Sequence, residues 1–249
     1  MIEAHSGGES PAKVAMVTGA SRGLGRELAL FLAARGFALV VTARSAPELA
    51  RAVADLEAKH ATVKALPGDV ADAGHRKALV EAARAFGRLD VLVNNASELG
   101  PVPLRPLRDA QADDLRHVLE VNLVAPLALV QEALPLLERS RGLVVDISSD
   151  AAVGAYPGWG LYGSSKAALD LATKTLANEL RASGVGAVAV DPGDMRTKMH
   201  QDAYQGQDIS DRPLPSVTLP FFAWLLSQEP LKVTGARFQA QGSLWEVPA

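Results

Sequence analysis

A glycine-rich segment near the N-terminus constrains the fold of this chain more than any other stretch. The apolar run from Lys13 to Thr18 predicts a β-strand, GASRGLG from Gly19 to Gly25 follows it, and a helical pattern begins at Arg26. A strand, a glycine-rich turn and a helix together can bind a pyrophosphate through backbone N–H groups and the helix N-terminus. The spacing differs from G-x-G-x-x-G, and a glycine-rich turn can also be purely structural.

Strand-like and helical patterns alternate along the rest of the chain. Strands are expected at 37–43, 62–66, 89–93, 142–149, 185–191 and 236–240, and helices at 47–59, 71–86, 109–138, 161–182 and 217–227. This alternation predicts an α/β fold with a doubly wound, mainly parallel sheet of about seven strands and helices on both faces. With 249 residues and no internal linker, we expect one dinucleotide-binding catalytic domain at 12–249 after a flexible tail at 1–11.

Composition narrows the possible functions. The chain has no cysteine, which excludes disulfides and thiolate catalysis, and its net charge is -3 without any basic run. The longest apolar run near the C-terminus, 217–226, contains Pro220 and is too short to span a bilayer. We therefore expect a cytoplasmic protein with no nucleic-acid partner and no membrane partner. No metal is expected either, because the histidines at 5, 60, 75, 117 and 200 match no metal-binding spacing.

Polar residues follow the expected strands at the edge where doubly wound sheets bind ligands. Arg44 follows the second strand, where folds that prefer NAD usually carry an acid. Arg44, with Arg22 from the glycine-rich loop, could therefore pair a 2′-phosphate, which favours NADP; the alternative is a solvated loop arginine. Asp69, after the third strand, could accept from an adenine amino group. Alternatively, Asp69 lies in the N-cap region of the next helix, where Asp72 is the better cap.

Two further features favour acid–base chemistry. Tyr162 and Lys166 lie one helical turn apart, and an ammonium beside a phenol favours the phenolate. The pKa of a free phenol is about 10, so a phenol that acts as an acid or base near pH 7 needs about 4 kcal/mol of differential stabilisation. We therefore expect groups other than Lys166 to contribute. Pro126 leaves the main-chain carbonyl of Asn122 without its helical donor, although Pro135 shows that a proline here can also be an incidental kink.

The polar, irregular stretch at 194–215 is expected to be a substrate lid.

Taken in their order along the chain, the motifs resemble those of the short-chain dehydrogenase/reductase (SDR) family in its single-domain form. The resemblance covers about residues 12–240. The resemblance implies a Rossmann-type sheet. The family's T-G-x-x-x-G-x-G corresponds to Thr18, Gly19, Gly23 and Gly25, and its N-N-A-G to Asn94, Asn95 and Ala96, with Ser97 where glycine is usual. Its helix asparagine, serine, Y-x-x-x-K pair and P-G correspond to Asn122, Ser149, Tyr162 with Lys166, and Pro192-Gly193 with Thr197 beyond.

The resemblance implies an NADP(H)-dependent oxidoreductase that interconverts a carbonyl and a secondary alcohol by hydride transfer. Tyr162 would be the general acid/base, Lys166 would lower the tyrosine pKa and hold the nicotinamide ribose, and Ser149 would hydrogen-bond the substrate oxygen. Asn122 would hold a water through its main-chain carbonyl and complete a proton relay to Lys166. The implied cofactor site comprises Gly19, Ser21, Arg22, Gly23, Leu24, Gly25, Arg44, Asp69, Val70, Asn95, Ala96, Tyr162, Lys166, Pro192, Gly193, Met195 and Thr197.

Alternatives and departures stay open at this point. The alternatives are an NAD-linked alcohol dehydrogenase or epimerase on the same scaffold, and a non-catalytic NADP-binding sensor or subunit. The resemblance further implies a small-molecule carbonyl or alcohol substrate and a homodimer or homotetramer. The departures are Ser97, Asp146 where the family often has asparagine, Asp191 before the P-G pair, and a C-terminus with Leu244 and Trp245 instead of a double glycine.

Overall fold

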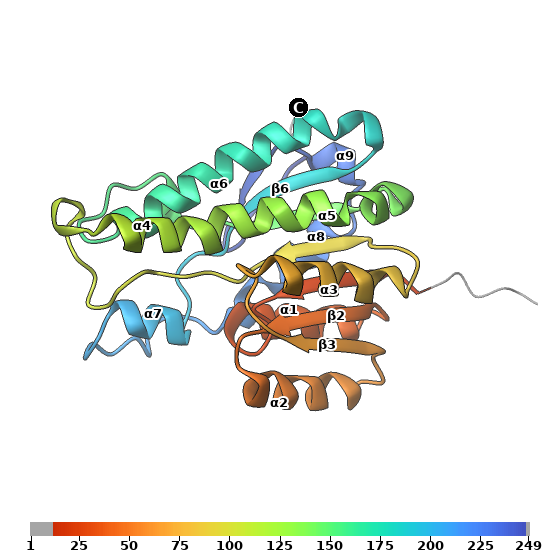
Figure 1. Cartoon of the computed structure of the whole chain (residues 1–249), viewed down its shortest axis with the longest axis horizontal. Coiled ribbons are helices and arrows are strands. Elements are labelled where there is room, and N and C mark those ends of the chain that lie inside the picture. The colour runs from red at the N-terminus through yellow and green to blue at the C-terminus, as the bar shows by residue number, and fades with distance from the viewer. Residues whose placement is uncertain (1–11, 248–249) are drawn as a thin grey trace, which may run out of the picture.

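A seven-stranded parallel sheet forms the centre of the molecule (Figure 1). The computed structural model describes residues 12–247, so the expected tail at 1–11 lies outside the described residues. The strand order is β3-β2-β1-β4-β5-β6-β7, and every neighbouring pair is parallel. The chain reverses its direction of winding between β1 and β4, as the prediction of a doubly wound sheet requires.

The elements follow the predicted alternation. The strands are β1 (Val14–Thr18), β2 (Ala38–Ala43), β3 (Val63–Pro67), β4 (Val91–Asn94), β5 (Leu143–Ile147), β6 (Gly186–Asp191) and β7 (Arg237–Gln239). The helices are α1 (Gly23–Ala33), α2 (Ala46–Glu57), α3 (Ala73–Arg84), α4 (Ala112–Leu119), α5 (Ala125–Ser140), α6 (Gly160–Glu179), α7 (Lys198–Ala203), α8 (Leu219–Leu225) and α9 (Pro230–Val233).

Two apolar cores lie on opposite faces of the sheet. Successive residues of a strand point to opposite faces, so Val17 and Val41 belong to one core and Met16 and Val40 to the other. Helices α1, α2 and α8 cover the first core, and α3, α5 and α6 cover the second. Burial on both faces explains why the strands are nearly continuous runs of Val, Ala and Leu.

The long helix expected at 109–138 is divided by a π turn. Helix α4 runs into the π turn Glu120–Val124, in which the N–H of Ala125 bonds to the carbonyl of Glu120, and α5 follows. Pro126 comes directly after this turn and cannot donate to the Asn122 carbonyl, whereas Pro135 lies inside α5 without interrupting it. The helical stretch 112–140 is long and apolar enough to cross a membrane by length and composition, but it packs against α3, α6 and the sheet.

The expected lid contains a short helix. Residues 198–215 were predicted to be irregular, but α7 forms there, and the hydroxyl of Thr197 caps it by accepting from the N–H of His200 at 3.2 Å. With two apolar residues among six, Met199 and Ala203, the segment carries too little apolar pattern to predict such a helix. At the C-terminus, Trp245 packs on Phe221 with ring centroids 5.5 Å apart, while Leu244 is exposed.

Thr18 joins the carboxyl ends of β1 and β4. Its hydroxyl oxygen accepts from the N–H groups of Asn95 at 2.9 Å and Ala96 at 3.0 Å, and Asn95 Nδ2 donates to the Thr18 carbonyl at 2.8 Å. Thr18 is 2% exposed, so water cannot replace these bonds. One buried hydroxyl therefore holds the loop after β4 against the glycine-rich loop after β1.

This arrangement predicts the effect of Thr18→Val, which keeps the shape of the side chain but removes the acceptor. The partly buried N–H groups of Asn95 and Ala96 then lose their partner, so we expect the free energy of unfolding to fall by about 1–3 kcal/mol. Urea denaturation measures the loss. Thr175→Val, at an exposed threonine of α6, is the control, with an expected change of no more than about 0.5 kcal/mol. Equal effects of the two substitutions would contradict the prediction.

Candidate active site

A cavity of about 910 Å³ lies at the carboxyl edge of the sheet and collects residues from all along the chain. The predicted site residues that line it come from the glycine-rich loop, the ends of β2 to β6 and α6. Of all the predicted site residues, Gly25 and Asn122 do not line it. The cavity is lined by Gly19, Ser21, Arg22, Gly23, Leu24, Arg44, Asp69, Val70, Asn95, Ala96, Ser149, Tyr162, Lys166, Pro192, Gly193, Met195 and Thr197.

The glycine-rich loop can take a dinucleotide phosphate. Gly19 has a φ of +68°, and a Cβ there would lie 2.8 Å from Asn95 Nδ2, so only glycine fits. A Cβ on Gly25 would overlap the Gly19 carbonyl oxygen, which explains why Gly25 supports the loop from outside the cavity. The N-cap residue of α1, Arg22, makes no side-chain capping bond, and the first turn holds no acid. The N-terminus of α1 is therefore suited to an anion.

Two arginines stand where the adenosine end of a dinucleotide would lie. Arg44, at the end of β2, pairs with Glu98 at 3.1 Å, and Arg22 pairs with Glu48 at 3.4 Å. Both guanidinium groups are more than half exposed, so these pairs contribute little to stability and can be exchanged for a phosphate. The residues present therefore fit a phosphorylated dinucleotide.

Tyr162 and Lys166 lie side by side and buried at the start of α6. Tyr162 is 8% exposed and Lys166 is 2% exposed. Lys166 Nζ donates to the carbonyl of Ile147, the last residue of β5, at 2.7 Å, and it lies 5.6 Å from the centroid of the Tyr162 ring. The ammonium is thus held against the sheet edge and within reach of the phenol.

Burial controls the pKa values of this pair. Burial raises the pKa of Tyr162 to about 12, although hydrogen bonding to the hydroxyls of Ser149 and Ser97 acts in the opposite direction. Burial also lowers the pKa of Lys166 to about 8, with Asp146 acting against it. In the chain alone, loss of water outweighs the hydrogen bonds to Ser149 and Ser97, so the pKa of Tyr162 is raised. The effect expected of Lys166 on this pKa stays a prediction. Tyr162 holds its proton at neutral pH, as an acid must.

Asn122 contributes its side chain as well as its main chain. Its Oδ1 accepts from the N–H of Glu98 at 2.8 Å and from Ser97 Oγ at 3.1 Å. Its Nδ2 donates to the Glu98 carbonyl at 2.8 Å and to Ser165 Oγ at 2.9 Å. Asn122 is fully buried, so it fastens the loop after β4 to α6 from behind the cavity. Ser97, a departure from the family pattern, is part of this fastening.

Ser149 lies at the cavity end of β5. Its Oγ donates to Asp150 Oδ1 at 3.0 Å and accepts from the N–H of Ala151 at 3.1 Å. Arg237 donates to the Ser149 carbonyl at 2.7 Å and pairs with Asp191 at 3.2 Å. Asp191, another departure, therefore shares a cation from β7 with Asp170, which lies 2.8 Å from Arg237.

Asp146, the third departure, belongs to the support beneath the site. It is 1% exposed and accepts from Asn94 Nδ2 at 2.8 Å and from Thr173 Oγ1 at 2.7 Å. Burial raises the pKa of the Asp146 carboxyl, and its two hydrogen bonds act in the opposite direction. The Asp146 carboxyl is therefore both hydrogen-bonded and raised in pKa.

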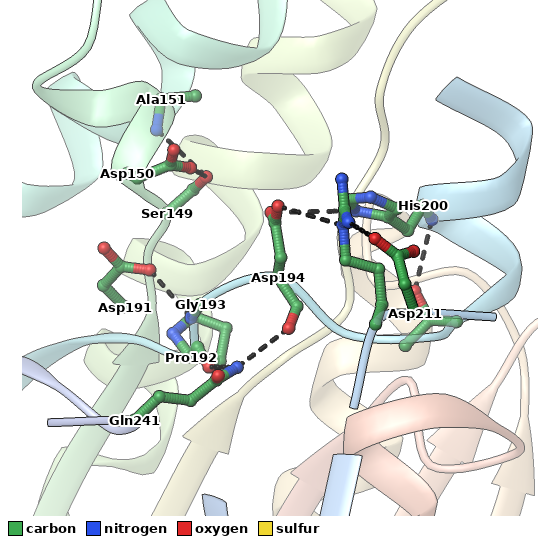
Figure 2. Close-up of polar contacts among 12 residues, drawn as sticks. Ser149, Asp150, Ala151, Asp191, Pro192, Gly193, Asp194, His200, Asp211 and Gln241 are labelled. Atoms are coloured by element: carbon green, nitrogen blue, oxygen red, sulfur yellow. Dashed lines mark hydrogen bonds and ion pairs between the residues drawn. The ribbon is translucent and has the colours of Figure 1, made fainter. Parts of the chain in front are cut away.

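Polar contacts within the lid, and from Gln241 to its first residue, hold the lid beside the end of β6 (Figure 2). Asp194 pairs with Arg212 at 3.4 Å, and its Oδ1 lies 3.9 Å from His200 Nδ1. Gln241 Nε2 donates to the carbonyls of Pro192 at 2.9 Å and Asp194 at 2.8 Å. These contacts place α7 over the cavity, so its residues form part of the wall.

Sequence reasoning missed one wall of the cavity. Asp150, Tyr156 and Trp159 line it from the loop between β5 and α6, and Tyr204 lines it from the lid. The ring centroid of Trp159 lies 5.8 Å from that of Tyr162 and 6.0 Å from that of Tyr204. The aromatic residues in the loop at 154–160 (GAYPGWG) were the sequence signal that could have indicated this wall. Within residues 12–247, no group of acids, histidines and cysteines could hold a metal ion.

A parallel sheet with a phosphate-binding loop and a buried tyrosine–lysine pair at its carboxyl edge defines a dinucleotide-binding oxidoreductase. Comparison with known proteins supports this class. The family model of the short chain dehydrogenases matches residues 13–208. The chain belongs to this family, and its class is that of NAD(P)-dependent oxidoreductases acting on CH–OH and C=O groups.

Similar proteins cover nearly the whole chain. The 3-oxoacyl-[acyl-carrier-protein] reductase FabG of Staphylococcus aureus is 33% identical over 246 residues, which are 94% of this chain and 98% of the relative. A short chain dehydrogenase structure from Pseudomonas syringae has a TM-score of 0.86 and 31% identity, covering 92% of this chain and 94% of that one. One from Shigella flexneri, complexed with NADP, has a TM-score of 0.85 and 27% identity, covering 92% and 97%.

The buried ammonium predicts a specific dependence of stability on pH. The pKa of Lys166 is lowered from 10.5 to about 8 in the folded chain, so between these pH values the unfolded chain binds more protons. Stability contributed by this group therefore rises with pH across the window. Relative to Lys166→Met, the wild-type chain should gain up to about 3 kcal/mol from below pH 8 to above pH 10.5.

Urea unfolding of both proteins over this pH range measures the gain. Lys174→Met, at an exposed lysine of the same helix, is the matched control, and its difference from wild type should not change with pH. A constant difference for Lys166→Met would show that the ammonium is better solvated than its burial indicates.

Proposed function

We propose that the protein is an NADP(H)-dependent oxidoreductase that interconverts a carbonyl compound and a secondary alcohol by hydride transfer, with Tyr162 as the general acid/base. The observation that carries the proposal is the position of the buried Tyr162–Lys166 pair, which lines the same cavity as Ser149 and the glycine-rich loop. A non-catalytic binding protein has no chemical need to bury a phenol and an ammonium side by side.

The proposed reaction assigns a task to each side chain. In reduction, a bound nicotinamide would supply the hydride to the carbonyl carbon, and Tyr162 would give its proton to the carbonyl oxygen, so that a secondary alcohol forms. Ser149 Oγ hydrogen-bonds the same oxygen and stabilises its developing charge. Lys166 holds the nicotinamide ribose and favours return of the proton to Tyr162. The Asn122 carbonyl, which Pro126 leaves without a helical donor, holds the water of a proton relay to Lys166.

The proposed cofactor is NADP. The N-terminus of α1 would hold the pyrophosphate, and Arg44 and Arg22 would hold the 2′-phosphate by exchanging their present carboxylate partners for it. Of the residues that line the cavity, Asp69 and Val70 would face the adenine, and Pro192, Gly193, Met195 and Thr197 would face the nicotinamide. The related Shigella flexneri protein, complexed with NADP, supports this choice.

Two wider predictions accompany this function. We expect a cytoplasmic enzyme, as the resemblance to its family implies. We also expect a homodimer or homotetramer. The exposed Leu171 on α6 and Val124 beside α5 are apolar surface available to a second copy, with exposed fractions of 68% and 43%.

A screen of NADPH consumption over a panel of carbonyl compounds, with NADH in parallel, tests the function. Tyr162→Phe removes the acid and keeps the ring, so we expect kcat to fall by about 10²–10⁴-fold for any substrate found. Binding of NADPH, followed by fluorescence titration, should change by less than about threefold because the phenol proton is not needed to hold the cofactor.

Two outcomes would contradict the proposal. Undiminished NADPH-linked reduction by Tyr162→Phe would remove the catalytic assignment. Tight NADPH binding without turnover of any carbonyl or alcohol, in either direction, would favour the non-catalytic sensor or subunit instead.

The assignment of the 2′-phosphate predicts the effect of Arg44→Ala. Loss of a charge-assisted hydrogen bond, about 1.5–3 kcal/mol, should weaken NADPH about 10- to 100-fold. NADH lacks this phosphate, so its dissociation constant should change by less than about threefold. Titration of both cofactors makes the measurement. Arg84→Ala, at an exposed arginine of α3 outside the cavity, controls for net charge. Equal losses for NADPH and NADH would exclude the assignment.

A further inference from the structure

The substrate end of the cavity has a wall of aromatic side chains. Tyr156 and Trp159, from the loop before α6, and Tyr204, from the lid, line it beside Tyr162. Trp159 packs edge-on against Tyr162, and Tyr204 stacks on His200 with ring centroids 4.8 Å apart. Such rings favour flat apolar ligands, and their faces also attract cations.

Carboxylates dominate the charge at the same end, and all but one are paired. Asp191 pairs with Arg237, Asp194 with Arg212, and Asp202 with Lys198. Asp150 makes no ion pair among residues 12–247, although its side chain accepts from Ser149 Oγ at 3.0 Å. Asp150 lines the cavity together with Tyr156 and Trp159, so this free carboxylate faces the same space as the aromatic wall. Asp150 also raises the pKa of the Tyr156 phenol.

Apart from the buried Lys166 ammonium, which the proposed function assigns to the nicotinamide ribose, cations are scarce where the substrate would bind. Lys198 lines the cavity, but both oxygens of Asp202 accept from its Nζ at 2.7 Å. No arginine lines the cavity beyond the cofactor end, where Arg22 and Arg44 lie, in the part of the chain that the structure describes. A carboxylate or phosphate on the substrate would therefore meet the unpaired Asp150 without a compensating charge.

A second observation points to a polar ligand at this end. The side chain of His200 is 10% exposed, lines the cavity, and its Nε2 has no hydrogen-bond partner among the described residues. Ser148 Oγ is buried and lines the cavity without a partner in the same way. Buried polar atoms are rarely left unsatisfied, so both atoms favour a ligand with hydrogen-bonding groups.

From these features we infer the substrate class: an aromatic carbonyl compound that carries a positively charged nitrogen group, which Asp150 holds against Tyr156 and Trp159. The inference rests on the proposed function, because it concerns the carbonyl compound that Tyr162 protonates. The aromatic ring packs on the wall, the cation neutralises Asp150, and the carbonyl oxygen reaches Ser149 and Tyr162. Asp150 is thus a specificity-determining residue adjacent to the catalytic serine.

Three ketones of similar size test the inference. They are 4-acetylbenzyl-trimethylammonium, its uncharged isostere 4-neopentylacetophenone, and the anion 4-acetylphenylacetate; a methylene insulates the carbonyl from each charge. With NADPH and the full chain, we expect kcat/KM for the cation to exceed that for the isostere at least tenfold. The anion should be the poorest substrate. Asp150→Asn should reduce the ratio of cation to isostere to below about twofold, mainly through KM.

The control variant is Asp113→Asn. Asp113 lies on α4, is 94% exposed and does not line the cavity. Its substitution therefore removes the same charge as Asp150→Asn, but far from the proposed substrate site. It should keep the full preference for the cation, and keeping it supports a local role for Asp150. Loss of the preference in Asp113→Asn would instead indicate a general effect of net charge and overturn the role of Asp150.

The remaining outcomes separate this inference from the proposed function. Reduction of the uncharged ketone without preference for the cation would overturn the substrate class and leave the oxidoreductase in place. A preference that survives Asp150→Asn would overturn the role of Asp150. No NADPH-linked turnover of these ketones or of the wider carbonyl panel would overturn the proposed function, and the inference with it.

Discussion

The removal of water from the Lys166 ammonium is the constraint on which the rest of the site depends. A charge with so little exposure needs close partners, and the carbonyl at the end of β5 is the nearest one. Asp146 lies on the same strand and offsets part of the cost, but it is buried too, and it depends on Asn94 from β4 and Thr173 from α6. The charges therefore hold one another in place, and the three elements cannot be positioned independently.

The sequence was sufficient for the fold because its signals are local and repeated. Strands of Val and Ala alternate with helices whose ends are marked, as where Asp72 caps α3 by accepting from the N–H of His75 at 2.6 Å. Local signals also located the glycine-rich loop and the Tyr162–Lys166 pair, which the structure brings to one cavity. Asn122 was located by the proline that follows it, although the bonds of its side chain could not be foreseen.

Properties that depend on distant contacts could not be predicted. The direction of the pKa shift of Tyr162 follows from its burial. Tyr162 belongs to a cluster with Trp159 of the loop before α6 and Met199 of the lid, which are separate in sequence. The aromatic wall combines Trp159, which precedes β6 in the chain, with Tyr204, which follows β6. Neither residue belongs to a periodic pattern that would mark it in the sequence. The free carboxylate of Asp150 becomes evident only once the ion pairs of the neighbouring acids are known.

The π turn before α5 rotates the buried face of α5 relative to that of α4. A π turn contains about one residue more than an α turn, so it advances the following helix by roughly 100° relative to an uninterrupted one. Beyond it, Leu129, Ala133 and Leu136 pack into the core under the sheet, while α4 buries Val118 alone. Deleting one residue from Glu120–Val124 would restore a regular helix and rotate either the core face or Asn122 out of position. An insertion of a single residue thus lets one helix serve both a packed interior and a reaction centre.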